Sequence, residues 1–177
     1  MTVINPCDYN QTKAATLAAA EHNGPVYLRF GRPVVPVFIP EDMPFEIGKG
    51  ILLQEGTDVT IVATGHLVWE SLLAAEELEK EGISCEIINI HTIKPLDEEI
   101  ILKSVEKTGK LVTAEEHNFL GGLGESIAGV LARKRPTPQE FVAVNDTFGE
   151  SGTPAELMKK YQIDAEAVIK AVKRIIE

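Results

Sequence analysis

The chain has 177 residues, 44% of them hydrophobic, and a formal net charge of −10. This length suits one full domain with a smaller attachment, and no apolar run approaches the roughly 20 residues that a membrane-spanning helix needs. Nucleic-acid binding relies on many Lys and Arg side chains that neutralise phosphates, so the acidic balance argues against such a partner. We therefore expect neither a membrane nor nucleic acid as a partner.

The cysteines and histidines restrict the chemistry further. The two cysteines, Cys7 and Cys85, lie far apart, which gives neither a disulfide framework nor a zinc pattern and suits a reducing cytoplasm. The four histidines show no metal-ligand spacing such as H-E-x-x-H. We expect a cytoplasmic protein whose chain binds no metal by itself.

The first predicted elements are one helix and one strand. A polar start at Asp8 and the alanine-rich run that follows predict a helix, because alanine is the best helix former. Pro25 lies in the turn that ends it, and Val26–Phe30 is rich in strand formers. A lone helix–strand pair cannot bury its own apolar faces. We therefore expect this segment to be the end of a domain that begins upstream, with unpaired strand edges, and to pack on a neighbouring chain or be partly mobile.

Prolines then interrupt the chain, and an alternating α/β pattern follows. Each proline removes a backbone donor and fixes φ, so residues 37–46 are predicted to form an extended linker. Strands that alternate with helices predict a mainly parallel sheet covered on both faces. The predicted strands are Gly48–Gln54, Asp58–Thr64, Ile83–Ile90, Leu111–Ala114 and Phe141–Asn145. The predicted helices are His66–Glu81, one opened by Pro95-Leu96-Asp97 and running to Lys107, one with Leu123, Ile127 and Val130 on one side, one starting at the capping box Thr153–Glu156, and one from Asp164 whose buried stripe holds Ile169, Val172 and Ile176.

The stretch VTAEEHNFLGGLGESIAGVLA, residues 112–132, combines a strand, a glycine turn and a helix start. Nucleotide-binding proteins hold phosphates in such a setting. The dinucleotide fingerprint G-x-G-x-x-G/A is incomplete, because its third position falls on Ile127, and Glu125 would repel a phosphate at the helix N-terminus. A Walker loop would need Gly-Lys-Ser/Thr, and Gly124 is followed by Glu-Ser. We interpret the turn as structural, with phosphate binding as the alternative.

Two further clusters are candidates for chemistry. Glu115-Glu116-His117 ends a strand on the side where open α/β sheets place their sites, so a carboxylate beside the histidine could transfer a proton. The favoured interpretation is a pair of solvated carboxylates with a histidine bonded to backbone. Arg29 and Arg32 lie at the carboxyl end of the first strand, where guanidinium groups could bind phosphate oxygens. A surface or interdomain salt bridge is the open alternative for both.

Four ordered blocks of sequence together resemble the C-terminal part of transketolase. They are GPVYLRFGRPVVP, INIHTIKPLD, VTAEEHNFLGGLGESIAGVLA and DTFGESGTPAELMKKYQID, and they extend over essentially the whole chain. The chain most resembles the shorter subunit of the split, two-chain form. Deoxyxylulose phosphate synthase and the β subunits of 2-oxoacid dehydrogenases carry weaker versions of these blocks. LRFGRP and the last block favour transketolase, and so does His91, where those β subunits commonly have an arginine.

The resemblance implies a domain division and a fold. Residues 1–36 would be the C-terminal remnant of the pyrimidine-binding domain, residues 37–46 a proline-rich linker, and residues 47–177 the transketolase C-terminal domain. That domain is a three-layer α/β/α unit with a five-stranded mixed, mostly parallel sheet. Its first strand is antiparallel to the rest and would be the weak strand at residues 48–54.

The resemblance also implies a function. Transketolases of the pentose phosphate pathway move a two-carbon ketol unit between sugar phosphates, using a divalent metal and thiamine diphosphate, whose thiazolium carbanion makes the bond. Arg32 matches an arginine that grips the sugar phosphate, and Arg29 would bind phosphate or support that loop. The activating glutamate and the metal and diphosphate site would lie on polypeptide outside this chain. We therefore expect no catalytic residue, no cofactor binding and no activity from this chain alone. The expected partners are an N-terminal transketolase section or subunit and a second copy, in a dimer or other homo-oligomer.

Three alternatives stay open. The chain could be the C-terminal part of one of the related thiamine enzymes. It could be a pure interaction module whose helices dock on a partner subunit, in which case Arg32 would not affect kinetics. A free-standing nucleotide-binding domain would be stabilised by NAD or ATP in a thermal shift, which we do not expect.

Overall fold

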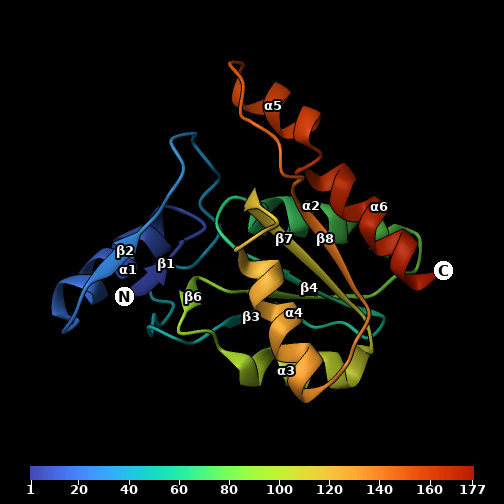
Figure 1. The fold of residues 1–177 in the computed structure, drawn as a ribbon, viewed down its shortest axis with the longest axis horizontal. Helices are drawn as coiled ribbons and strands as arrows, with labels where there is room; N and C mark the ends of the chain where they lie inside the picture. The colour runs from blue at the N-terminus through green and yellow to red at the C-terminus, as the bar shows by residue number, and fades with distance from the viewer.

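The computed structural model describes residues 1–177, and a five-stranded mixed sheet lies at its centre (Figure 1). The strand order is β3-β5-β4-β7-β8; β3 runs antiparallel to β5, and the other neighbours are parallel. The strands are β3 Ile51–Gln54, β4 Val59–Ala63, β5 Cys85–Asn89, β7 Leu111–Asn118 and β8 Gln139–Val144. The predicted mixed, mostly parallel sheet and its antiparallel first strand are confirmed.

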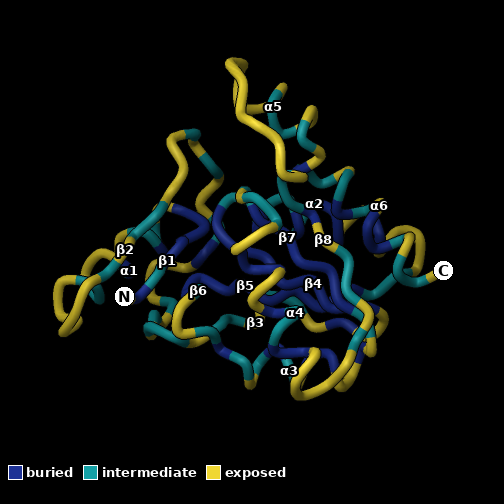
Figure 2. Tube along the Cα trace, viewed as in Figure 1, coloured by how far each residue is buried: buried dark blue, intermediate teal, exposed yellow.

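Helices cover both faces of this sheet, which confirms the predicted three-layer α/β/α fold. The helices on one face are α2 Leu67–Lys80 and α6 Ala165–Ile176, and those on the other are α3 Glu98–Thr108 and α4 Leu123–Lys134. Successive residues of β4 reach opposite cores, because Ile61 packs under α2 and α6 whereas Val62 packs under α3 and α4. The central strands are accordingly buried in Figure 2. None of the helices is both long enough and apolar enough to cross a bilayer.

The helix ends follow the local sequence signals. The side chain of Asp97 caps α3, and Gly109 ends that helix in the left-handed conformation with φ 70°. Helix α5, Pro154–Tyr161, starts at the predicted capping box, in which the Thr153 N–H donates to the Glu156 carboxylate at 3.1 Å. These ends depend on contacts within a few residues, which the sequence displays directly.

Several details differ from the sequence prediction; β3, for example, starts at Ile51 instead of Gly48. β7 continues past Ala114 to Asn118, because its polar end still pairs with β8, and β8 starts two residues early, at Gln139. The fully buried positions of α6 are shifted by one residue along the helix from the predicted stripe, since its contact with the sheet decides which face turns inward. They are Val168, Ala171 and Val172, and the predicted Ile169 and Ile176 are only partly buried.

The N-terminal residues form a second, smaller sheet together with part of the main domain. Strand β1, Thr2–Ile4, lies between the parallel β2, Val26–Leu28, and the antiparallel β6, Thr92–Lys94. Helix α1, Tyr9–Glu21, connects β1 to β2. The prediction of a lone helix–strand pair with unpaired edges is therefore wrong for one edge of β2. β1 and β6 are three residues each, too short to show a strand period in the sequence.

The proline-rich segment after β2 has no regular structure, as predicted, but its middle is anchored. No helix or strand lies between Leu28 and Ile51. Ile39 is buried, and its C=O accepts a hydrogen bond from the Asn10 side chain at 2.8 Å. The segment is thus attached to α1.

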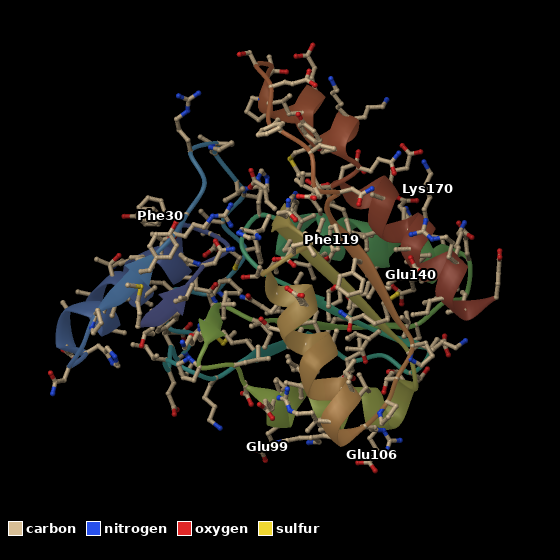
Figure 3. The ribbon with its side chains drawn as sticks, viewed as in Figure 1. Phe30, Glu99, Glu106, Phe119, Glu140 and Lys170 are labelled. Atoms are coloured by element: carbon tan, nitrogen blue, oxygen red, sulfur yellow. The ribbon has the colours of Figure 1, made fainter.

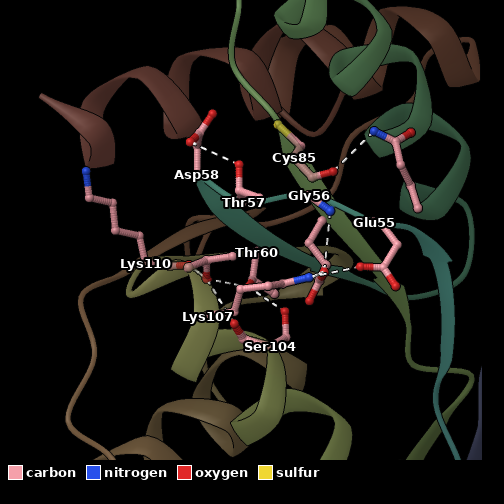
Figure 4. Close-up of polar contacts among 12 residues, drawn as sticks. Glu55, Gly56, Thr57, Asp58, Thr60, Cys85, Ser104, Lys107 and Lys110 are labelled. Atoms are coloured by element: carbon pink, nitrogen blue, oxygen red, sulfur yellow. Dashed lines mark hydrogen bonds and ion pairs between the residues drawn. The ribbon is translucent and has the colours of Figure 1, made fainter.

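A buried polar network closes the amino ends of β4 and β5 (Figure 4). The Glu86 carboxylate accepts hydrogen bonds from Lys107 and, at 3.4 Å, from the Gly56 N–H. The Thr60 hydroxyl bonds to the Ser104 hydroxyl at 2.6 Å. Burial acts to raise the pKa of Glu86, but Lys107, Ser104 and the Gly56 N–H together lower it. These groups satisfy one another's hydrogen bonds, so the amino ends of the strands have a structural role. The candidate site lies at the carboxyl ends of the parallel strands.

Candidate functional site

The loop that carries Arg32 lies at the edge where the parallel strands end. It follows β2 and projects from the same side of the molecule as the arm that bears α5 (Figure 1). Arg32 is exposed, and its guanidinium makes neither a hydrogen bond nor an ion pair within the protein. The guanidinium of Arg29, by contrast, is hydrogen-bonded. Arg32 therefore forms no salt bridge within this chain.

Arg29 is partly buried and has a different environment. Its Nη2 donates to the backbone carbonyl oxygen of Glu116 at 2.6 Å, and its backbone N–H donates to the C=O of Ile4 at 2.8 Å. Both acceptors are backbone carbonyls, so Arg29 makes no salt bridge. It joins the start of the Arg32 loop to both β1 and β7.

A hollow of about 390 Å³ lies between the Arg32 loop and the α5 arm. Arg32 and Pro33 line it from the loop, and His66 and Glu116 line it from the ends of β4 and β7. The Glu116 carboxylate lies 3.9 Å from Nδ1 of His66. The neighbouring strands β4 and β7 bring these two groups together. The sequence marks His66 only as a helix start, although its position directly after a buried strand is a signal for the site edge.

The glycine turn binds a carboxylate of its own chain. Glu115 is 3% exposed, and its two oxygens accept the backbone N–H groups of Leu123 at 2.7 Å and Gly124 at 2.8 Å. These amides open α4, where a phosphate would otherwise bind. A Cβ on Gly122 would lie only 2.4 Å from a Glu115 oxygen, so glycine lets the carboxylate approach. The turn is structural, as interpreted, and its anion position is filled.

The predicted solvation of Glu115 is therefore wrong, and the three-residue cluster does not act as one acid–base group. Burial raises the pKa of Glu115, and the two N–H groups, His117 and Arg29 oppose that shift only in part. Successive residues of β7 point to opposite sides, so Glu116 faces the Arg32 loop instead of α4. The ring Nδ1 of His117 lies 2.8 Å from the C=O of Asn118, which agrees with the backbone-bonded interpretation.

Two other groups that could suggest chemistry are held in the interior. His91 is buried and stacked on Phe45 with ring centroids 4.2 Å apart, and burial lowers its pKa to about 4. Burial likewise raises the pKa of the Cys7 thiol, whose sulfur accepts the Asn89 amide at 3.3 Å. Neither group is poised for proton transfer or nucleophilic attack at neutral pH.

Together these features define an α/β/α domain, attached to a small N-terminal unit, that presents one unpaired arginine at the carboxyl edge of its sheet. The family model of the transketolase C-terminal domain matches residues 48–168. The protein belongs to this transketolase family.

Known relatives match the whole sequence but extend well beyond it. The 6-deoxy-6-sulfo-D-fructose transketolase subunit SqwH of Clostridium sp. (strain MSTE9) is 46% identical over 178 residues, which are 100% of this chain and 55% of the relative. One of the subunits of the apulose-4-phosphate transketolase of Phocaeicola vulgatus is 34% identical over 100% of this chain and 57% of its own length. A solved structure described as "Split gene transketolase, inactive beta4 tetramer" superposes with a TM-score of 0.96 and 46% identity, covering 99% of this chain and 58% of that one. The sequence thus spans about half the length of the curated relatives it matches.

Proposed function

We propose that the protein is the C-terminal section of a thiamine-diphosphate-dependent transketolase, which moves a two-carbon ketol unit between sugar phosphates. Arg32 binds the phosphate of the substrate. The observation that carries this proposal is an exposed guanidinium with no partner in the protein, beside a hollow at the carboxyl edge of the sheet. Arg29 is already bonded to Glu116, so we assign the phosphate contact to Arg32 alone.

We place the cofactor and its divalent metal on polypeptide outside this chain. The residues present do not fit either group. The glycine turn that opens α4, the stretch that most resembles a phosphate-binding loop, is filled by the Glu115 carboxylate. No cluster of three or more His, Cys, Asp or Glu side chains has the geometry to hold a metal ion. In this proposal the groups that carry out the ketol transfer itself therefore lie on the partner polypeptide.

The partner in this proposal is the N-terminal transketolase section or subunit, joined with further copies of this chain in a homo-oligomer. The relatives support it, since their names describe subunits and a split gene, and they are almost twice as long as this sequence. In the structure, β2 lies at the edge of its sheet, with β1 on one side only. Exposed apolar side chains lie on this strand and the elements next to it: Tyr27 in β2, Phe30 just after it and Leu17 in α1; Figure 3 labels Phe30. A protein surface of this kind fits burial against another polypeptide.

The decisive experiment replaces Arg32 in the complete enzyme. Arg32→Ala removes a charged contact worth about 1.5–3 kcal/mol, so KM for a phosphorylated acceptor rises by about 10- to 100-fold at similar kcat. KM for an unphosphorylated two-carbon aldehyde stays the same. A sulfonated ketose belongs in the assay, because one relative is named for such a substrate.

A matched control removes an arginine elsewhere on the surface. Arg174 pairs with Glu140 at 2.7 Å between α6 and β8, in the region where Figure 3 labels Glu140. Arg174→Ala leaves KM for both acceptors unchanged. If Arg32→Ala behaves like Arg174→Ala, the phosphate assignment is refuted.

A further inference from the structure

The loop that carries Arg32 has no hydrogen bonds of its own. Residues 30–37 neither donate nor accept any within the protein; the bonds begin only at Arg29 on one side and Phe38 on the other. Val34, near the middle of the loop, is 98% exposed. Hollows adjoin the loop, and Pro33 borders two of them. A segment that makes no hydrogen bonds is held in position mainly at its two ends.

Arg29 fixes the first end. Its backbone N–H bonds to β1 through the C=O of Ile4 at 2.8 Å, and its guanidinium bonds to β7 through the C=O of Glu116 at 2.6 Å. β7 is itself held there, because the preceding residue, Glu115, binds the first amides of α4. The start of the loop is therefore connected to the central sheet and to the N-terminus of α4.

Asp8 fixes the second end. One oxygen of its carboxylate accepts the N–H groups of Phe38 at 2.9 Å and Ile39 at 2.8 Å. The other oxygen caps α1 by accepting the N–H of Gln11 at 2.8 Å. Asp8 is 3% exposed, so these charge-assisted bonds form away from water, where they are strong. One buried carboxylate thus joins the end of the loop to the start of α1.

We propose that Asp8 and Arg29 are positioning residues for Arg32, which hold the two ends of its loop so that the guanidinium is presented at one place. The inference rests on the proposed role of Arg32 in phosphate binding. Neither residue needs to touch the substrate. They restrict the loop before the substrate binds. A loop that was free until then would have to become ordered on binding, and that loss of conformational entropy would weaken the affinity.

Asp8→Asn tests this proposal with little change of shape. Asparagine is a good N-cap, so its oxygen can still accept the Gln11 N–H. Its NH₂ group then faces the donors of Phe38 and Ile39 and can accept neither. In the complete enzyme, KM for the phosphorylated acceptor rises by about tenfold, which corresponds to about 1.4 kcal/mol. KM for the unphosphorylated aldehyde and kcat stay within twofold, and amide hydrogen exchange at Phe38 and Ile39 becomes faster.

Asp97→Asn is the matched control, because Asp97 has the same double role elsewhere. One of its oxygens accepts an amide of α3 at 3.3 Å and the other accepts the Gly50 N–H at 2.9 Å. It is also buried, at 8% exposure, and it makes no contact with the Arg32 loop. Asp97→Asn leaves the ratio of the two KM values unchanged. A general loss of stability would affect both variants alike.

Arg29→Ala and Arg32→Ala separate the possible outcomes. Arg29→Ala raises KM for the phosphorylated acceptor selectively. If Asp8→Asn fails to fold, Arg29→Ala alone tests whether the ends of the loop position Arg32. If only Arg32→Ala has an effect, the positioning roles are refuted and the phosphate role stands. If Arg32→Ala has no effect, the proposed function fails and the positioning roles fail with it.

Discussion

The contact between the glycine turn and Glu115 can be tested by adding one methyl group. Gly122 has φ −90° and ψ −166°, a conformation that alanine adopts without strain. In Gly122→Ala the new Cβ would lie 2.4 Å from one carboxylate oxygen of Glu115 and 2.6 Å from the other. The carboxylate must then leave the N–H groups of Leu123 and Gly124. Two charge-assisted hydrogen bonds are lost at about 1.5–3 kcal/mol each, so we expect the free energy of unfolding to fall by about 3–6 kcal/mol.

Urea unfolding of the protein measures this loss, and a second glycine of α4 provides the control. A Cβ on Gly129 would lie 3.4 Å from only the flexible end of Arg133, so Gly129→Ala stabilises the helix by about 0.5–1 kcal/mol. In a Glu115→Ala background, Gly122→Ala costs only the poorer N-cap, about 1 kcal/mol. If Gly122→Ala costs as much in that background as in the wild type, the carboxylate is not the reason for the glycine.

Other contacts yield further expected outcomes. Burial lowers the pKa of His91 to about 4, whereas in the unfolded protein it is about 6.5. Between these pH values the unfolded protein binds more protons than the folded protein, so the free energy of unfolding falls by about 3 kcal/mol as the pH drops from 7 to 4. Urea titrations at both pH values should show this loss in the wild type but not in His91→Gln; equal losses would contradict it. Lys107→Met leaves the buried Glu86 carboxylate without its cation and lowers the free energy of unfolding by about 2–3 kcal/mol, and adding Glu86→Gln should restore part of it. Burial raises the pKa of Cys7 and also that of Cys85, the latter to about 12, so a thiol reagent should label both only as fast as the protein opens; fast labelling of the native protein would disprove this.

Much of the fold could be predicted because its signals are local. The capping residue Asp97 and the left-handed Gly109 lie within a few residues of the backbone groups that they satisfy. The strand Val59–Ala63 is buried on both faces of the sheet, so its residues are apolar apart from Thr60. The resemblance of the four sequence blocks then placed these elements in a known order. Arg32 was also predicted from the sequence as a candidate site residue, because it is an arginine just after a strand.

The supports of the site could not be predicted, because they join residues far apart in the sequence. Asp8 looks like an ordinary helix cap, and nothing near it in sequence shows that Phe38 and Ile39 return to it. Glu115 looks solvated beside two other polar residues, until α4 turns back and places its first amides on the carboxylate. β1 was missed for a similar reason, since its three residues form a strand by pairing with β2 and β6, which lie far from it in the sequence.

By itself, the sequence determined the five strands of the main sheet, the helices and, through four blocks that resemble transketolase, the family to which the protein belongs. The elements follow from side-chain periodicity, capping and turn residues, all of which act over a few positions. Only the tertiary structure decided which polar groups are buried and which remain available. The sequence around a helix N-terminus is the same whether its anion comes from a ligand or from the protein itself, and only the path of β7 places Glu115 there.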